Sequence, residues 1–303
     1  MRVLVIGIGS IGKRHINVIK KLQPKTKFYA LRSSKKSIDY QDIVNINSWD
    51  EVDKYNFDFS IVSSPSSLHL EHIEKLSKYK LPVFVEKPLC VNKSQLKKIN
   101  INKFHAMTYV GLNMRFHPLI IYLKNFLNKS DFKIYEINAY YGSYMPSWRS
   151  GNHRKIYSSN KELGGGVHLD LIHEPDILHF LFGLPKKIHK SFRKVSNITI
   201  DSIDFSNLIF EYEDFSAIIT LNYFRKDKKR VMEIITDKNT LEIDFTKGTI
   251  TDLHINKKLL QLKGDLMAES YERQMEFWLD SLKKKNKKIN NLLESKELLN
   301  MIL

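Results

Sequence analysis

Apolar and polar positions alternate along the first third of the chain in a repeating strand and helix pattern. Short runs of β-branched and aromatic residues suit the pleated interior of a sheet. Between them, apolar positions recur at helical spacing, as in the segment that stops before Pro24. The predicted strands are residues 1–6, 27–31, 59–62 and 83–85. Strands and helices alternating at this spacing predict a doubly wound parallel sheet, an α/β fold.

The rest of the chain has a different pattern. Strand-like runs dominate residues 187–262, and short polar turns such as Asp237–Lys238–Asn239 separate them. They predict a large, mainly antiparallel meander with one open face. We expect two domains, residues 1–117 and an α+β domain of residues 118–303, with the last helix packing back on the first domain. Five residues form one stripe of a helix over 268–282 and are predicted core positions: Tyr271, Met275, Trp278, Leu279 and Leu282.

Composition narrows the class of protein. The 303 residues are 42% hydrophobic and 27% charged, as in a soluble globular protein. We expect no membrane insertion, because no apolar run approaches the roughly 18 residues of a membrane helix. The start of the chain is too short and too soon glycine-rich for a signal peptide. The single cysteine, Cys90, cannot form an intrachain disulfide, which predicts a cytoplasmic setting.

The formal net charge of +16 has two interpretations. A basic surface can concentrate polyanions such as nucleic acid. The lysines are scattered, however, and no nucleic-acid motif accompanies them, so we expect no nucleic-acid partner. A solvated lysine-rich surface explains most of the charge, and attraction of an anionic cofactor or substrate explains the remainder.

A glycine-rich turn follows the first strand at once, as Gly7–Ile8–Gly9–Ser10–Ile11–Gly12. Between a strand and a helix, each glycine has a function: Gly7 permits the tight turn, Gly9 lets the backbone approach a pyrophosphate, and Gly12 lets the helix pack on the strand. The helix amino terminus then offers N–H groups to phosphates. The turn therefore predicts a Rossmann domain that binds a dinucleotide, although a purely structural turn is the alternative.

The end of the second strand bears on which dinucleotide binds. NAD sites usually place an acid there to bind the ribose 2′-hydroxyl. This chain instead has Arg32, Ser33 and Ser34, which suit a 2′-phosphate. We expect NADP, with NAD as the alternative, unless this segment is only an exposed basic turn.

Two further strand ends carry candidate site residues. Ser64, Pro65 and Ser66 follow one strand and can cap a helix or touch the cofactor, and His69 is expected at the helix start, facing the dinucleotide. Glu86–Lys87–Pro88 follows the next strand, because proline cannot donate to a ladder. Lys87 is thereby placed at the carboxyl edge of the sheet, where open α/β sheets bind ligands, and both Glu86 and Lys87 are expected to contact the cofactor.

Together the glycine turn, the Ser-Pro-Ser-Ser-Leu-His loop and Glu86–Lys87–Pro88 resemble the Gfo/Idh/MocA oxidoreductases, the glucose–fructose oxidoreductase and inositol dehydrogenase family. The resemblance covers nearly the whole chain. It implies that Lys87 contacts the reacting hydroxyl, that the Lys87–Pro88 peptide bond is often cis, and that the open sheet makes a homodimer or homotetramer.

The same resemblance marks residues after the first domain. Asn113 and Arg115 are expected to face the substrate, although Arg115 could equally be an interdomain salt-bridge partner. A polar, aromatic loop over residues 148–157 suits sugars or phosphates, with Arg154 and Tyr157 the main candidates, and oligomer contact is the alternative.

After Gly164–Gly165–Gly166, one helix is expected to present Asp170, His173 and Glu174 on a single face. The family's commoner pattern separates aspartate and histidine by four residues, so this chain departs from it. It matches a branch associated with bacterial surface-sugar and sialic-like sugar pathways. His173 is the candidate proton-transfer group, Asp170 orients or balances charge, and Glu174 orients these groups or binds a substrate hydroxyl. No metal is expected, because His168 points away from His173 on a helix.

The sequence therefore predicts an NAD(P)-dependent oxidoreductase. Its substrate is expected to be a hydroxyl or ketone of a sugar, nucleotide sugar or cyclitol. Two alternatives remain, a glycosidase of the same scaffold that retains its NAD and a non-catalytic protein that senses NADP.

Overall fold

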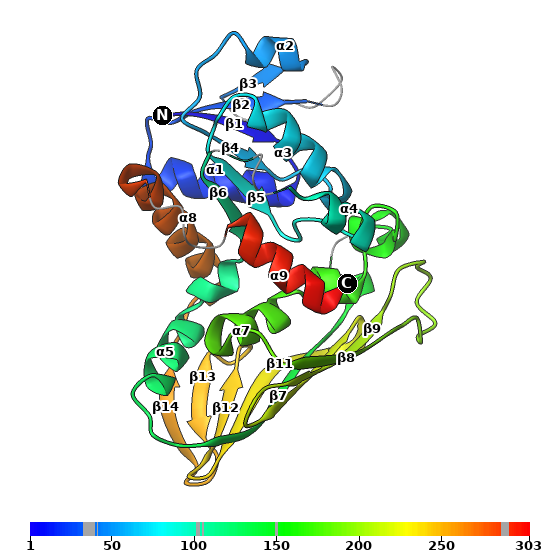
Figure 1. The fold of residues 1–303 in the computed structure, drawn as a ribbon, viewed down its shortest axis with the longest axis vertical. Helices are drawn as coiled ribbons and strands as arrows, with labels where there is room; N and C mark the ends of the chain where they lie inside the picture. Colours follow the sequence, from blue (N-terminus) through cyan, green and yellow to red (C-terminus); the bar gives the residue numbers. More distant parts are fainter. Residues whose placement is uncertain (33–39, 41, 101–103, 105, 149–150, 286–290) are drawn as a thin grey trace. The chain divides into compact units, whose positions relative to one another are not determined.

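The computed structural model describes residues 1–303 except 33–39, 41, 101–103, 105, 149–150 and 286–290 (Figure 1). The chain divides into two compact units. The first contains residues 1–112, 271–301 and 303, and the second contains residues 113–270 and 302.

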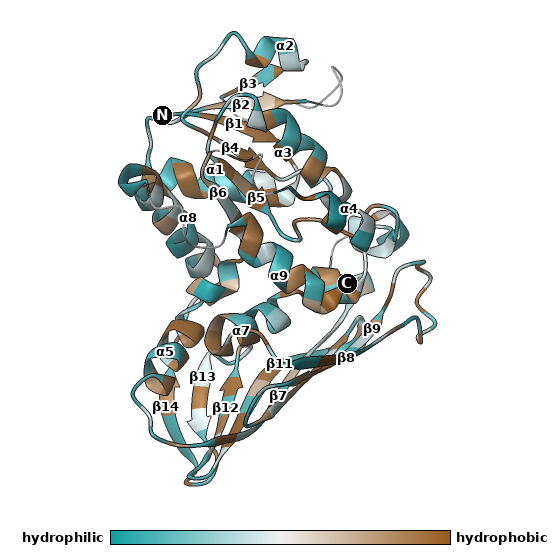
Figure 2. Ribbon diagram, in the orientation of Figure 1, coloured by the Kyte–Doolittle hydropathy of each residue, from teal (hydrophilic) through white to brown (hydrophobic). Residues whose placement is uncertain are grey.

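A six-stranded parallel sheet forms the centre of the first unit, in the order β3-β2-β1-β4-β5-β6 (Figure 1). The order reverses between β1 and β4, so the sheet is doubly wound and the predicted Rossmann architecture is confirmed. Figure 2 shows β1 and β4 as mostly hydrophobic, which fits a sheet covered on both faces. The strands are β1 (Arg2–Ile6), β2 (Lys27–Leu31), β3 (Ile43–Ile46), β4 (Phe59–Val62), β5 (Val83–Glu86) and β6 (Thr108–Gly111). The sequence-based prediction missed β3 and β6, the two four-residue strands at the edges of this sheet.

Helices pack against this sheet through apolar stripes. In α1, Ile16 and Ile19 are fully buried. In α8, Met275, Trp278 and Leu279 are buried as predicted, and Trp278 packs edge-on against Phe59 and Phe84. The unit's helices are α1 (Ser10–Leu22), α2 (Trp49–Val52), α3 (His69–Ser77), α4 (Lys93–Lys98), α9 (Leu292–Ile302) and, from Tyr271 onwards, α8 (Leu266–Lys284).

The second unit is built on an eight-stranded sheet in the order β14-β13-β12-β11-β7-β10-β9-β8. The predicted strand runs and mainly antiparallel pairing are confirmed, but the simple meander was wrong. β7 lies between β10 and β11 and pairs with β10 in parallel. Only Tyr223 separates β10 from β11, and this connection is too short for a two-residue hairpin. In its pairing with β7, β11 changes register between Phe224 and Lys229. The strands are β7 (Ile134–Tyr144), β8 (Lys187–Arg193), β9 (Phe205–Glu211), β10 (Ser216–Asn222), β11 (Phe224–Thr236), β12 (Thr240–Asp244), β13 (Thr249–Asp252) and β14 (Lys257–Gln261).

The helix predicted after the triple glycine is two helices, α6 (Val167–Asp170) and α7 (His173–Phe182). Asp170 therefore ends one helix and His173 begins the next, so the single helical face predicted for them was wrong. Pro175 gives the reason, because it has no N–H to donate to the carbonyl of Leu171 and its ring would clash with that carbonyl in a continuous helix. Within the first turn of α7 the same proline is tolerated.

One α-helix of the second unit and several 3₁₀ segments of the two units remain. The remaining α-helix is α5 (Pro118–Leu127), capped by the His117 side chain, which accepts from the Leu119 N–H. Five 3₁₀ segments occur among the described residues of the chain: η1 (Ser66–Leu68), η3 (Asn113–Phe116), η4 (Met145–Ser147), η5 (His153–Lys155) and η6 (Tyr157–Ser159).

Candidate active site

The glycine turn after β1 has the form that a dinucleotide requires. Gly7 has φ +94°, and a Cβ there would lie 2.5 Å from the Ser64 nitrogen. A Cβ at Gly12 would lie 2.3 Å from the Gly7 oxygen, whereas one at Gly9 would meet nothing within 4 Å. The backbone is therefore accessible to a phosphate at Gly9, whereas at Gly12 the close packing leaves no room for a side chain. Since α1 begins without a side-chain cap or an acidic residue in its first turn, the residues fit a bound pyrophosphate.

The loop after β4 is tied to the glycine turn. The Ser63 hydroxyl donates to the Gly7 carbonyl at 2.7 Å, and the Ser64 hydroxyl lies 2.9 Å from Nδ1 of His72. Ser66 is buried and Pro65 is exposed. Ser33 and Ser34, also predicted to contact the cofactor, lie outside the described residues, and Arg32 is half-buried at the end of β2.

His69 begins α3 as expected, but its ring contacts backbone. It is 1% exposed, with Nδ1 2.9 Å from the Pro88 carbonyl and Nε2 2.9 Å from the Ser64 carbonyl. Burial lowers the pKa of this imidazole, and the two carbonyls act in the opposite direction. His69 therefore links the loop after β4 to the turn that carries Lys87.

Lys87 follows β5 on a backbone held from both sides. The Glu86 carboxylate is buried, with Oε1 2.5 Å from Nε2 of His15 on α1 and Oε2 accepting from the Lys87 N–H at 3.2 Å. The Lys87–Pro88 peptide bond is cis. The Lys87 side chain is half-buried, whereas Pro88 is buried. Glu86 therefore positions the lysine backbone, and its buried carboxylate contacts both His15 and the Lys87 N–H.

In the second unit, the side chains of Asn113 and Arg115 form hydrogen bonds with buried side chains. The Asn113 amide donates to the Ser270 hydroxyl at 2.7 Å. Arg115 donates from Nε and Nη2 to both oxygens of Asp176 at 2.6–3.1 Å, and both side chains are almost fully buried. Arg115 therefore forms an ion pair, as in its alternative role, but the expected pairing between domains was wrong, because Asp176 lies within the same unit.

Asp170 and Glu174 have different surroundings. The Tyr223 hydroxyl donates to Oδ2 of Asp170 at 2.5 Å, and burial, together with the Asp170 charge, raises the pKa of Tyr223 well above its usual value. Glu174 is 3% exposed, and its Oε1 accepts from Nε of Arg230 at 2.5 Å. His173 is half-buried at the start of α7. The side chain of His173 is therefore more accessible than that of Glu174.

The loop before the triple glycine is packed closely against it. Tyr157 donates to the Gly164 carbonyl at 2.7 Å, whereas Arg154 is exposed. A Cβ at Gly165 would lie 2.6 Å from the carbonyl oxygens of Tyr157 and Ser158. The prediction that the glycines let backbones pass closely is therefore confirmed at Gly165.

Family models match both units in turn. Residues 1–101 match the model of an oxidoreductase family with an NAD-binding Rossmann fold, and residues 133–251 match the Gfo/Idh/MocA C-terminal domain. The chain belongs to the Gfo/Idh/MocA oxidoreductase family. It is accordingly an NAD(P)-dependent oxidoreductase, and the glycine turn described above belongs to its cofactor domain.

Solved structures share the fold of this Gfo/Idh/MocA oxidoreductase at low sequence identity. A putative NADPH-dependent oxidoreductase from Desulfitobacterium hafniense is 15% identical, with a TM-score of 0.82, covering 100% of this chain and 93% of that one. A myo-inositol dehydrogenase from Corynebacterium glutamicum is 15% identical, with a TM-score of 0.78, covering 100% and 94%. The WlbA dehydrogenase from Bordetella pertussis, in complex with NADH and UDP-GlcNAcA, is 15% identical, with a TM-score of 0.80, covering 98% and 93%.

The described residues of the oxidoreductase contain neither a membrane-spanning helix nor a candidate metal site. No helix there is both long and apolar enough to cross a bilayer. In the same part of the chain, no group of three or more histidine, cysteine or acidic side chains could hold a metal ion. His168 is buried and stacks on Phe192, with ring centroids 4.7 Å apart.

Sequence reasoning missed the partners of the predicted site residues. These are His15 beside Glu86, Tyr223 beside Asp170, Arg230 beside Glu174 and Asp176 beside Arg115. Each of these four partners lies 53–71 residues from the residue that it contacts. A buried charge needs a partner, so their existence could be expected, but their identity could not.

Proposed function

We propose that this oxidoreductase moves a hydride between bound nicotinamide and a carbinol or ketone carbon of a sugar, nucleotide sugar or cyclitol. Gly7, Gly9, Gly12 and the residues after β4 would hold the dinucleotide. When bound, its nicotinamide ring supplies the hydride acceptor in oxidation and the donor in reduction.

The chain's own side chains would handle the proton and the charge on oxygen. In oxidation, His173 takes the hydroxyl proton as the C–H bonding pair leaves the same carbon and the C=O bond forms. Lys87 donates a hydrogen bond to that oxygen and stabilises its developing negative charge. Asp170 orients the two groups and balances their charge. In reduction, the same proton returns from His173 to the oxygen.

One observation carries the proposal. The glycine turn after β1, the loop after β4 and Lys87 after β5 all lie at the carboxyl edge of one parallel sheet, and β1 and β4 flank its switch point. Ligands of doubly wound sheets bind at this place. A lysine whose backbone N–H donates to Glu86, and whose following proline carbonyl contacts His69, is suited to act beside a bound dinucleotide.

The loop before the triple glycine and the fold relatives support the substrate class. Arg154 and Tyr157 lie on a polar, aromatic loop of the kind that binds carbohydrate. Glu174 remains a candidate for positioning the substrate hydroxyls through its pair with Arg230. Fold relatives include an inositol dehydrogenase and a dehydrogenase in complex with UDP-GlcNAcA. We therefore propose a role in surface-polysaccharide or sialic-like sugar biosynthesis.

A substrate panel tests the proposal. The protein is incubated with NAD or NADP and with sugars, nucleotide sugars and cyclitols, and nicotinamide absorbance is followed while products are analysed. We expect a net change in absorbance with at least one member. Products of glycosidic cleavage without net redox change would indicate the glycosidase, and cofactor binding with no turnover across the panel would indicate the sensor.

The choice of cofactor gives a separate prediction. We propose that NADP is preferred and that Arg32 contacts the 2′-phosphate, since charge-assisted pairs of this kind are strong. Replacing Arg32 with Ala should lower kcat/KM for NADPH about tenfold and leave that for NADH nearly unchanged. Lys54→Ala, which removes an exposed cation of the same unit, is the control. A wild-type preference for NADH would contradict this assignment.

The open sheet is the proposed oligomer surface. Ile209 on β9 and Ile218 on β10 are direct cross-strand neighbours and are 39% and 40% exposed. We expect a homodimer or homotetramer by sedimentation equilibrium and a shift towards monomer when Ile218 is replaced with Asp, because a charge there opposes burial. A wild-type protein that sediments as a monomer at micromolar concentration would contradict the proposal.

A further inference from the structure

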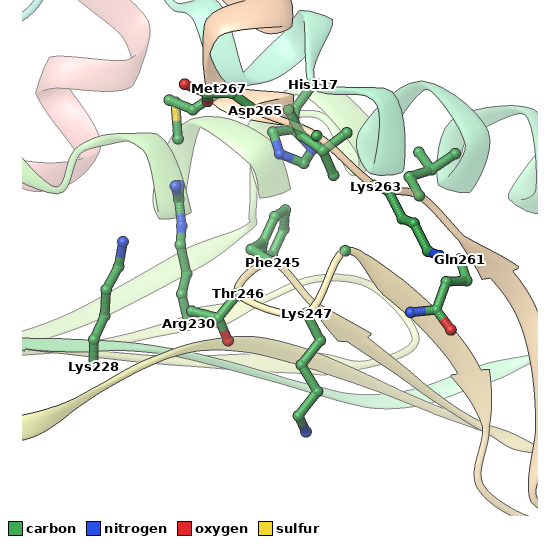
Figure 3. A pocket seen from close by; sticks show the side chains of 14 residues that line it. His117, Lys228, Arg230, Phe245, Thr246, Lys247, Gln261, Lys263, Asp265 and Met267 are labelled. Carbon is green, nitrogen blue, oxygen red and sulfur yellow. The ribbon is translucent and has the colours of Figure 1, made fainter.

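A cavity of about 390 Å³ lies in the second unit beside the amino-terminal end of α8 (Figure 3). Its lining comes from the start of α5, from β11, from the turn after β12 and from the segment that joins β14 to α8. The volume lies within the roughly 300–1,000 Å³ typical of small-molecule sites. Its lining contains none of the residues that the sequence analysis assigned to cofactor or substrate.

His117 presents a hydrogen-bond donor in this cavity. The side chain is 2% exposed, and its Nδ1 accepts from the Leu119 N–H at 3.3 Å. In a neutral imidazole the proton must then be on Nε2, for which no acceptor is found among the described residues. Burial lowers the pKa of His117 to about 4, and the Arg230 charge acts in the same direction, so the ring is neutral at physiological pH. Figure 3 shows the ring near Phe245, with centroids 5.4 Å apart.

Arg230 presents a second, charged donor. It is 5% exposed, and its Nε donates to Glu174. Its Nη1 lies 3.4 Å from the Met114 sulfur, while Nη2 is buried and has no hydrogen-bond partner among the described residues. A buried donor without an acceptor costs free energy, so a ligand acceptor at this guanidinium would remove that cost.

The remaining charges of the lining favour an anion. Lys228, Lys247 and Lys263 also line the cavity, against one acid, Asp265. Lys247 pairs with Asp244 at 2.9 Å, and Asp265 caps α8 by accepting from the Ala268 N–H at 2.9 Å. Lys228 and Lys263 are exposed and add positive charge beside the positive end of a 19-residue helix.

We propose that this cavity binds a phosphate group, free or carried by a small organic molecule, through Arg230 and His117. A phosphate offers three acceptor oxygens and up to two negative charges, and it matches an arginine, a neutral donor, two lysines and a helix amino terminus better than a carboxylate does. This site goes beyond the proposed hydride transfer. The Arg230–Glu174 pair connects it to the segment that carries Asp170 and His173.

Calorimetric titration tests the proposal without turnover. The protein is first saturated with NADP, so that the glycine turn and the proposed 2′-phosphate contact at Arg32 are occupied. It is then titrated at constant ionic strength with inorganic phosphate, glucose 1-phosphate, UDP or acetate. We expect saturable binding of phosphate compounds and weaker binding of acetate. Tighter binding of an organic phosphate than of inorganic phosphate would identify an organic ligand, and equal affinities would identify free phosphate. No saturable phosphate binding would overturn the proposal.

Matched variants locate the binding. Arg230→Lys keeps a cation for Glu174 but removes the second guanidinium nitrogen, and should weaken phosphate binding about tenfold. Arg193→Lys, at an exposed arginine on β8, should leave the affinity unchanged. If Arg230→Lys does not fold, His117→Asn decides, because asparagine can still cap α5 while the Nε2 donor is lost. Unchanged affinity in His117→Asn would contradict the site.

The two exposed lysines of the lining are expected to contribute less to phosphate affinity than Arg230. Lys228→Gln with Lys263→Gln should weaken phosphate binding several-fold and should flatten its dependence on salt. The control is Lys187→Gln with Lys257→Gln, which removes the same charge from exposed positions on β8 and β14 that do not line the cavity. Equal losses in the two double variants would mean that only overall charge attracts phosphate, and would overturn the assignment to this cavity.

Discussion

Replacing Lys87 with Ala is expected to lower kcat by about 10²–10⁴-fold with the substrate found in the panel, the range for loss of a positioned proton or charge partner. Affinity for the dinucleotide should change little, because the glycine turn is held by Ser63 and by its own backbone geometry. Turnover measured by nicotinamide absorbance, with cofactor binding measured by fluorescence, separates the two effects.

Two comparisons make the Lys87 result specific. Lys54→Ala removes an exposed lysine of the same unit and should leave kcat unchanged. Lys87→Arg keeps the charge but changes the position of the donors, so it should restore little activity. A Lys87→Ala protein that turns over at the wild-type rate would disprove the assigned role, whatever its cofactor affinity.

The second large effect concerns stability. Changing Asp176 to Asn leaves the Arg115 guanidinium buried without its charge partner, and should lower the free energy of unfolding by about 3–5 kcal/mol. The pair is suited to this test because its side chains are only 3% and 0% exposed. Urea denaturation followed by tryptophan fluorescence and circular dichroism measures the change as a lower midpoint at constant slope.

An exposed ion pair of the same unit provides the control. Asp131 contacts Lys238 at 2.6 Å, but its side chain is 91% exposed. Asp131→Asn should therefore leave the urea midpoint unchanged, because water and salt screen such a pair. Equal midpoints for Asp176→Asn and wild type would show that Arg115 finds another partner or that the buried pair does not stabilise the unit.

Local sequence signals were sufficient for the glycine turn and for the four central strands of the cofactor domain. The glycine turn, the strand ends and Pro88 each depend on backbone geometry that a few neighbouring residues determine. The Pro175 break between α6 and α7 is also a local signal, and it was overlooked because the spacing of Asp170, His173 and Glu174 suggested one helix. The position of β7 between β10 and β11 had no such local signal, since pairing is decided between segments far apart in the chain.

By itself, the sequence determined the doubly wound sheet, the dinucleotide turn and the place of Lys87 at the end of β5. Those features follow from hydrophobic period, glycine and proline, which act over a few residues. Only the tertiary structure decided that Glu86 pairs with His15, Asp170 with Tyr223 and Glu174 with Arg230. Buried polar groups must find partners, and the partner is chosen by which strands and helices pack together, not by distance along the chain.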